Sequence, residues 1–375
     1  MSIGAFREAV PLNLHGLVAA PSQVWGSVRL VPLIRARVRE DLRVDRRVYD
    51  AVGVVKAAHN RTYISYIPHG LVFRWSTDGT PAAALGSWIG KPEGQVFGKG
   101  SPVRLLDRMV RREGDKALRL LPLHTAMEGF LSLGFAGPDV AWKEYGQKVL
   151  RFGFSPRVET AVPGAAIMDL SDALRIFEIH EDQCGVLLFV GDALASAMVL
   201  PHPADYRLLH RTMLQDFYGE LLWQYGQLYR EAPRWSVTLD DRVDSFAALG
   251  EALQAATSAW AAFDLSMAEG LLGRTLQAET VYTAGPFVLR RFLTGLVPGE
   301  ENHLGELITA PDGELMVLRT YRLSEAQVKR GYLLSQLVEA EWNLEVLAKK
   351  LNCPVDELMR RVVNAGFGQI FVRPV

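Results

Sequence analysis

The sequence predicts an α+β protein with a mixed or antiparallel central sheet covered by helices, and with a hairpin plus a helix-turn-helix-like helical unit at the C-terminal end. Residues 184–190 form an apolar run with the length of a strand buried on both faces, and residues 195–200 return after a Gly-Asp turn. From Leu209, apolar residues recur every four positions, which is typical of a helix packed on a sheet. Two apolar segments flank Pro311-Asp312-Gly313, a strong hairpin signal.

Length and composition set the expected organisation. A chain of 375 residues is long for a single core, so two or three domains are expected. Apolar residues make up 49% and charged residues 22%, and the net charge of -1 gives no sign of a general polyanion binder. The predicted regions are an N-terminal α+β region (1–160), a central strand meander with covering helices (161–285), and the hairpin with the helix-turn-helix-like unit (286–375).

The cysteine content and the apolar windows point to the cytoplasm. Cys184 and Cys353 lie far apart in sequence, which fits a reduced protein and excludes a cysteine-rich zinc module. Arg7 and Glu8 stand where a secretory signal needs apolar residues. The most apolar window, residues 185–200, is shorter than a bilayer span and contains an aspartate. We therefore expect a soluble cytoplasmic protein without a membrane partner.

The N-terminal region offers one clear strand and one basic segment. Residues 28–34 have strand composition, and Pro32 suggests an edge strand because proline cannot donate a hydrogen bond to a ladder. The segment 29–47 holds seven arginines interleaved with three acidic residues. This mixture favours a solvated face with ion pairs over a phosphate-binding patch.

Further elements are expected in the second half of the chain. Residues 245–270 are rich in alanine and predict one or two helices. Residues 287–296 fit a short helix or a strand, and the sequence leaves this choice open. Ser324 is expected to begin a helix, and Asn343 is a good N-cap for the next one. Pro354 suits the first turn of the last helix.

A polar cluster just before the predicted hairpin is the first candidate site. Glu301, His303 and Glu306 are acceptable ligands for a divalent metal, and His303 is also a candidate for ligand binding or proton transfer. A divalent ion would ease the approach of a phosphate to these acidic side chains. However, alternation along a strand places Glu306 on the face opposite to the other two. The alternative is a hydrogen-bonded loop whose groups pair with nearby arginines such as Arg319 or Arg322.

Two further histidines are candidates for ligand binding. His202 stands before a helix predicted to begin near Ala204, and the N-terminus of a helix favours an anion. That corner would suit a phosphate-bearing ligand, although Asp205 in the first turn would compete with it. His210 lies near the apolar stripe of the same helix, where a structural role at the edge of the core is the favoured alternative.

The C-terminal helices have the length and the tight turn of a helix-turn-helix. Acidic and basic residues are nearly balanced over residues 343–366, whereas helices that read DNA usually carry a basic face. DNA therefore stays open as a partner but is not favoured.

Several phrases of the sequence together resemble one protein family over nearly the whole chain. These phrases are PGAAIMDLSDALRIFEIHEDQCGVLLFVGDALASAMVLPHPADYRLLHRTMLQDFYGELL, YISYIPHGLVFRW, LPLHTAMEGFLSLGF, EENHLGELI, TYRLSEAQVKRGYLL and the terminal AGFG. The family that they resemble is the second type of the "ARG and rhodanese-phosphatase-superfamily-associated protein", in which ARG means ADP-ribosylglycohydrolase. The resemblance implies a place beside enzymes of ADP-ribose and NAD metabolism, and it brings no catalytic residues.

The function expected from residues and resemblance together is that of a cytoplasmic accessory protein of ADP-ribose or NAD metabolism. It would bind a phosphate-containing, nucleotide-like ligand, and hydrolysis of that ligand is left open. The sequence does not define catalytic residues, a metal or an oligomeric state. The alternative is a regulator that contacts DNA or a protein partner through its C-terminal helices.

Overall fold

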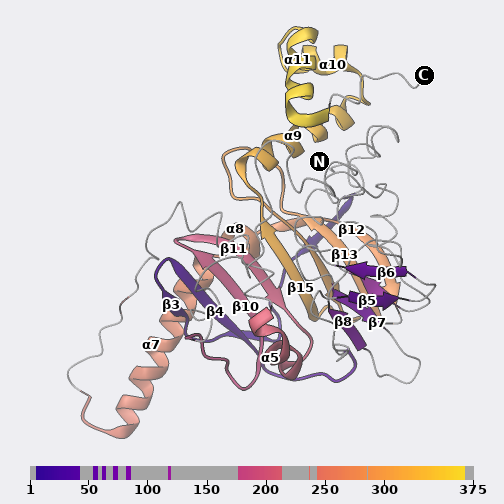
Figure 1. The fold of residues 1–375 in the computed structure, drawn as a ribbon. Helices are drawn as coiled ribbons and strands as arrows, with labels where there is room; N and C mark the ends of the chain where they lie inside the picture. Colours follow the sequence, from indigo (N-terminus) through magenta and orange to yellow (C-terminus); the bar gives the residue numbers. More distant parts are fainter. Residues whose placement is uncertain are drawn as a thin grey trace.

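A ten-stranded antiparallel sheet forms the centre of the structure, so the α+β class is confirmed (Figure 1). The structure is a computed structural model that describes residues 6–42, 54–57, 61–64, 71–74, 82–85, 117–119, 176–212, 236, 243–284 and 286–367. The strand order is β1-β12-β13-β14-β15-β11-β10-β4-β2, with β3 also paired to β4. The strands are β1 (Glu8–Pro11), β2 (Leu17–Ala19), β3 (Gln23–Trp25), β4 (Val28–Arg35), β10 (Gln183–Val190), β11 (Ala193–Val199), β12 (Thr275–Ala284), β13 (Phe287–Leu293), β14 (His303–Thr309) and β15 (Leu315–Arg322).

This sheet curls on itself. β1 and β2 lie at opposite ends of the strand order, yet only residues 12–16 separate them in sequence. Five residues span at most about 18 Å, whereas nine strands in a flat sheet would be about 38 Å across. One core cluster accordingly joins buried side chains of β4, β10 and β11 to those of β12–β15. The face that carries this core is termed the inner face, and the opposite one the outer face.

The apolar run of the sequence forms the most buried pair of strands, as predicted. Every residue of β10 and β11 is buried. Gly191 between them has φ 64°, a conformation that favours glycine in a tight turn. The helix expected after this pair is α5 (Pro203–Thr212), and it lies against β10. The strand pair and the start of the helix after it are therefore confirmed, whereas the rest of the predicted helix lies outside the described residues.

β4 is an internal strand, so the edge position predicted from Pro32 is wrong. One side of β4 pairs with β10 along its whole length. On the other side, β3 pairs with residues 28–30 and β2 with residues 33–35. Pro32 falls between these two short partners, where its missing amide hydrogen removes no ladder hydrogen bond.

The second half of the chain contributes four consecutive strands to the same sheet. Residues 287–293 form a strand, which settles the choice that the sequence left open, and β12 before it was not predicted. The predicted hairpin is confirmed as β14 and β15. The predicted boundary at residue 285 falls between the paired strands β12 and β13, and strands from all three predicted regions share one sheet.

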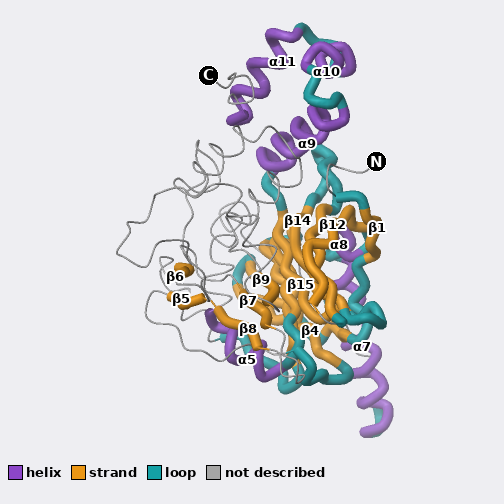
Figure 2. Tube along the Cα trace, turned by 90° about the vertical axis from the view of Figure 1, so that its right-hand side faces the viewer, coloured by secondary structure: helices purple, strands orange, loops and turns teal. Residues whose placement is uncertain are grey.

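Helices and smaller sheets lie on both sides of the main sheet. In Figure 2, α7 (Phe246–Ser266) and α8 (Glu269–Leu272) lie on one side, and α5 lies on the other with a small sheet of order β8-β7-β9. These small strands are β7 (Leu71–Arg74), β8 (Ala82–Leu85) and β9 (Ala117–Arg119), and β5 (Val54–Ala57) pairs with β6 (Arg61–Ile64).

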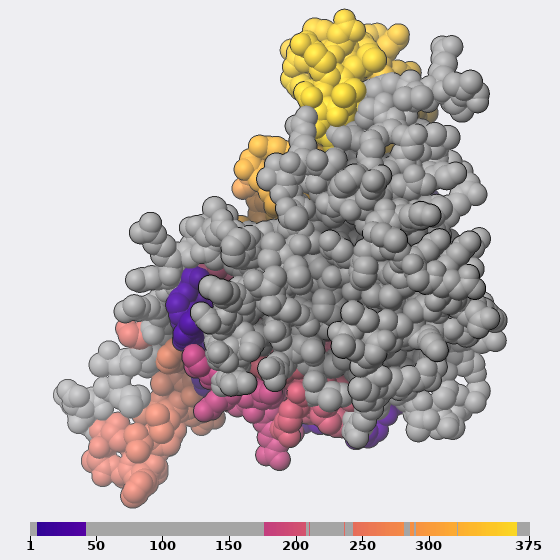
Figure 3. Space-filling model, in the orientation of Figure 1, coloured from indigo at the N-terminus to yellow at the C-terminus, as the bar shows by residue number. Residues whose placement is uncertain are grey.

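α7 is anchored at its C-terminal half only. Arg29 Nη1 lies 3.0 Å from Asp264 Oδ1, and Trp260 donates a hydrogen bond of 2.9 Å to Ser22. At the other end Phe246 is 94% exposed, and the helix projects from the molecule (Figure 3). In the described ranges, no helix has the length and apolarity to cross a membrane.

The C-terminal helices stand beyond one end of the sheet (Figures 1 and 3). The predicted caps are present, because Ser324 and Gln327 form a capping box and Asn343 accepts hydrogen bonds from two backbone amides. A π-helical turn (Val363–Phe367) ends the described part of this unit. The three helices are α9 (Glu325–Glu339), α10 (Leu344–Lys350) and α11 (Val355–Val362).

Candidate functional site

Glu301 holds His303 at the start of β14. The imidazole Nε2 of His303 lies 2.6 Å from Oε1 of Glu301, and His303 is fully buried. The loop before this pair is closed by Asn302, whose side-chain amide donates hydrogen bonds to the carbonyls of Val297 and Glu300. This is the hydrogen-bonded loop expected as the alternative to a metal site.

Burial and nearby charges set the protonation of this pair. Burial lowers the pKa of His303 more than the hydrogen bond to Glu301 raises it. Burial acts to raise the pKa of Glu301, but the contact with His303 and the charges of Arg322 and Arg274 lower it overall. At neutral pH, the imidazole of His303 is therefore neutral, and its Nε2–H donates a hydrogen bond to the Glu301 carboxylate. Nδ1 is an acceptor with no hydrogen-bond partner among the described residues.

Glu306 does not join this pair, so the predicted metal site of Glu301, His303 and Glu306 is not formed. Glu306 lies three positions after His303 along β14, so Glu306 lies on the outer face and His303 on the inner face. Instead, Arg322 contacts Glu301 at 3.4 Å. In the part of the chain that the structure describes, no three His, Cys, Asp or Glu side chains gather closely enough to hold a metal ion.

On the outer face, Glu306 belongs to a charged row that crosses four strands. The register places Glu279 of β12 opposite Arg291 of β13, and Arg291 opposite Glu306. Glu306 is in turn opposite Arg319 of β15. The charges therefore alternate along the row. Arg291 Nη2 lies 2.7 Å from Glu279 Oε2 at one end.

The Glu306 carboxyl group is buried in the middle of this row. Arg291, Glu306 and Arg319 are each 1% exposed. Neither carboxyl oxygen of Glu306 has a hydrogen-bond partner among the described residues. Burial raises the pKa of Glu306 to about 8, and the charges of Arg319 and Arg291 only partly oppose that rise. The row thus holds a buried carboxyl group that is mostly neutral at pH 7.

A glycine next to Glu306 brings the strands together at the row. A Cβ atom on Gly305 would lie 2.3 Å from the carbonyl oxygen of Arg319 and 2.7 Å from the ring of Phe292. Only glycine allows this approach. The position of Glu306 between its neighbours therefore depends on Gly305.

His202 and His210 both have local partners that fit structural roles. His202 Nδ1 accepts a hydrogen bond from the amide of Ala204, and Nε2 lies 2.9 Å from Glu40. The ring thus occupies the helix N-terminus that was expected to receive an anion. His210 Nδ1 lies 3.0 Å from the hydroxyl of Tyr206, and burial lowers the pKa of His210 to about 4. No described contact joins either histidine to the charged row.

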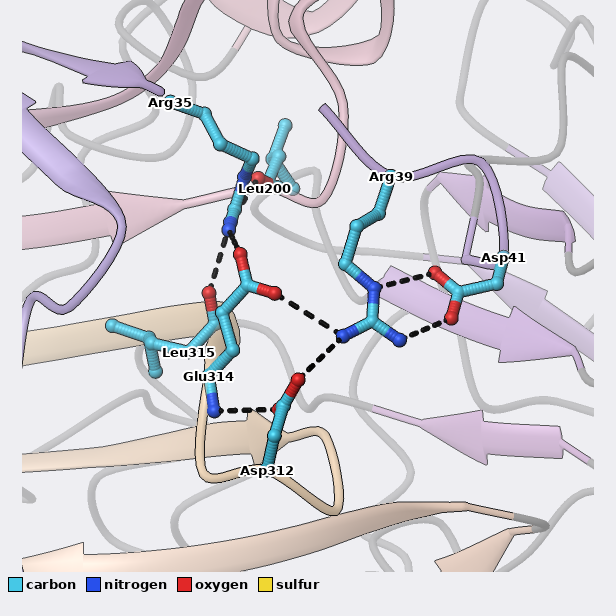
Figure 4. Close-up of polar contacts among 7 residues, drawn as sticks. All are labelled: Arg35, Arg39, Asp41, Leu200, Asp312, Glu314 and Leu315. Atoms are coloured by element: carbon cyan, nitrogen blue, oxygen red, sulfur yellow. Dashed lines mark hydrogen bonds and ion pairs between the residues drawn. The ribbon is translucent and has the colours of Figure 1, made fainter. Parts of the chain in front are cut away.

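Three arginines of the basic segment, Arg29, Arg35 and Arg39, form ion pairs with other parts of the chain. Arg29 and Arg35 are buried, so the predicted solvated face is wrong for them, although the predicted ion pairs are present. Figure 4 shows Glu314 between Arg35 Nη1 at 2.6 Å and Arg39 Nη1 at 3.1 Å. Arg39 also contacts Asp41. This network fixes residues 36–42 against the turn between β14 and β15.

Sequence reasoning missed Glu279 and Arg291 and named Arg319 only as an ion-pair partner. One signal was available, because each of these four strands carries a charged residue within an otherwise mostly apolar segment. The register that aligns those residues arises only in the folded sheet.

The fold and the charged row define an α+β protein whose curled sheet carries buried, alternating charges on its outer face. A family model described as ARPP-2 matches residues 12–285, and the chain belongs to that family. No curated protein and no solved structure matches the chain. The family match ends before Arg291, Glu306 and Arg319, so it does not cover these members of the row.

Proposed function

We propose that the charged row binds a phosphate-containing, nucleotide-like ligand, and that the chain is a cytoplasmic accessory protein of ADP-ribose or NAD metabolism. The carrying observation is the Glu306 carboxyl group, which is buried between two arginines without a hydrogen-bond partner among the described residues. About 90% or more of buried polar groups in proteins are hydrogen-bonded. An exception of this kind supports a role in which a ligand supplies the partner.

The residue types of the row suit such a ligand. Guanidinium groups such as those of Arg291 and Arg319 match the geometry and charge of phosphate oxygens. A carboxyl group accepts hydrogen bonds from ribose hydroxyls, as acidic residues do in dinucleotide-binding folds. The row supports binding, and it leaves open whether the bound ligand is hydrolysed. The metabolic setting is supported by the sequence resemblance.

Access to the row is a requirement of this proposal. Glu306 is 1% exposed, so a ligand reaches it only when the outer face is uncovered there. Binding would then supply the missing hydrogen bonds of Glu306, which favours the complex over the unliganded protein.

Isothermal titration with ADP-ribose, NAD and duplex DNA tests the proposal. Two neighbouring arginines on β13 give a matched pair of variants, because Arg291 lies in the row and Arg290 lies on the inner face beside Glu8. Arg291→Met should weaken ADP-ribose binding about 10- to 100-fold, the value of one charge-assisted hydrogen bond. Arg290→Met should leave the affinity within about threefold of the parent.

Two results would count against this function. One is the absence of binding of ADP-ribose and NAD to the parent protein. The other is equal loss of affinity in both arginine variants when thermal melts show both to be folded, because the effect would then be a general consequence of removing sheet arginines.

A second candidate function is contact with a protein partner through α10 and α11. These helices carry half-exposed apolar side chains, with Val346 at 51% and Val363 at 52% exposure. Two of their four basic residues, Lys350 and Arg361, form ion pairs within the C-terminal unit. Because these two basic side chains are already paired with carboxylates, they attract DNA phosphates less, and a protein partner is favoured over DNA. In the titrations, tight binding of duplex DNA would favour the regulator instead.

A further inference from the structure

The carboxyl group in the middle of the row is not hydrogen-bonded to the arginines opposite it. Residues directly opposite on neighbouring strands have Cβ atoms about 4.5–5.5 Å apart, and opposite charges so placed usually pair. Arg291 and Arg319 are both directly opposite Glu306. Nevertheless, the carboxyl group of Glu306 forms no hydrogen bond with either guanidinium group. The carboxyl group of Glu306 therefore lies between two opposite arginines without a hydrogen bond to either of them.

The missing hydrogen bonds of Glu306 define which kind of ligand would fit the row. Glu306 has two oxygens that lack donors, and it is too buried to obtain them from bulk solvent. The flanking arginines favour a negative charge nearby and oppose a metal cation at Glu306. A fitting ligand therefore presents hydrogen-bond donors next to an anionic group. Vicinal hydroxyls beside a phosphate have this arrangement, whereas inorganic phosphate has no donors apart from its own P–OH groups.

We propose that Glu306 recognises ribose hydroxyls while Arg291 and Arg319 contact the adjacent phosphate, so that the row selects a phosphorylated ribose with free hydroxyls over its deoxy counterpart. This inference rests on the proposed function, because it specifies which part of the nucleotide-like ligand occupies the row. A site built to hydrogen-bond a hydroxyl discriminates strongly against a ligand that lacks it, since the buried acceptor is then left unpaired. Glu306 is thus the residue that sets specificity.

Titration with ribose 5-phosphate, 2-deoxyribose 5-phosphate and inorganic phosphate tests this inference. The parent protein should bind the ribose sugar at least about tenfold more tightly than the deoxy sugar. In Glu306→Gln, the preference should fall to about threefold or less, while the affinity for inorganic phosphate stays within about threefold of the parent. Glu8→Gln, on the inner face at the edge strand β1, is the matched control and should keep the parent's preference.

The possible outcomes distinguish a failure of this inference from a failure of the proposed function. Equal binding of the two sugars by the parent overturns the hydroxyl recognition and leaves a phosphate site standing. If folded Glu306→Gln still prefers ribose 5-phosphate over 2-deoxyribose 5-phosphate, another residue recognises the hydroxyl, and this result also overturns the inference. No binding of either sugar or of ADP-ribose removes both proposals. The comparison of sugars on the parent needs no variant, so it decides the question even if Glu306→Gln fails to fold.

Discussion

At the scale of single residues, Glu306 and His210 are buried ionisable groups that are costly to charge. Glu306 lies 1% exposed on the outer face, and its pKa rises to about 8. His210 is buried on α5, and its pKa falls to about 4. A charge without a compensating partner is expensive inside a protein, so each group remains neutral near pH 7. Each therefore couples folding stability to pH in a different range and direction.

Glu306 should make the folded protein less stable as the pH rises. Its pKa is raised from the ordinary 4.5 to about 8, so between these values the folded chain holds a proton that the unfolded chain releases. The contribution of Glu306 to stability is therefore largest below pH 4.5 and is lost as the pH rises toward 8. Urea unfolding at pH 5 and pH 8 should show the parent losing more stability than Glu306→Gln. An identical loss in the two proteins would show that Glu306 does not titrate in this way.

His210 should have the opposite effect at lower pH. Burial lowers its pKa from 6.5 to about 4, so between these values the unfolded chain binds a proton that the folded chain does not. Stability should therefore fall as the pH is lowered through this range. His210→Gln should reduce that fall in urea melts between pH 6.5 and pH 4.5. The prediction fails if the variant loses as much stability as the parent.

At the scale of elements, the row depends on how closely β14 approaches its neighbours. Gly305 is the point of closest approach, since an added Cβ atom would collide with the backbone of β15 and the ring of Phe292. The strands that flank it are held by continuous antiparallel pairing on both sides. The same pairing places Arg291, Glu306 and Arg319 in line.

Two glycine variants test this dependence. Gly305→Ala should destabilise the protein by about 1–3 kcal/mol or more, because backbone atoms must move to admit the methyl group. Gly250→Ala is the control, since Gly250 lies in α7 with nothing within 4 Å of its added Cβ atom. That change should stabilise the protein by about 0.5–1 kcal/mol through helix propensity. Equal effects of the two substitutions in denaturant melts would contradict the close approach at Gly305.

At the scale of the whole molecule, the helical C-terminal unit stands apart from the sheet that carries the charged row (Figure 1). Basic and acidic residues are mixed in this unit, and Lys350 is paired with Glu339 at 2.5 Å. The first turn of α11 carries Asp356 and Glu357. Acidic residues at the start of a helix oppose the approach of DNA phosphates.

Electrophoretic mobility shifts with random duplex DNA at low salt should therefore show weak binding or none. Inverting Asp356 and Glu357 to lysine together should strengthen the shift, because it replaces repulsion by attraction at the start of α11. Tight binding by the parent, with affinity that falls steeply as salt increases, would contradict this expectation and favour the regulatory function.

How far the sequence predicts the structure depends on whether a feature is local. The strands at 184–190 and 195–200, the turn at Gly191 and the caps at Ser324 and Asn343 were predictable because each depends on neighbouring residues. The opposite faces of His303 and Glu306 also followed from strand alternation. The charged row was not predictable, because it arises from the register of four strands. In β13, the adjacent Arg290 and Arg291 also interrupt the alternation of apolar and polar residues that predicts a strand.

The most direct test of the charged row is a crystal structure of the protein grown with ADP-ribose. We predict ligand density on the outer face of the sheet, with ribose hydroxyls within hydrogen-bonding distance of Glu306 and a phosphate beside Arg291 or Arg319. Ligand bound elsewhere, or a Glu306 carboxyl group fully hydrogen-bonded to protein groups while the ligand site is empty, would contradict the assignment of the row as the binding site.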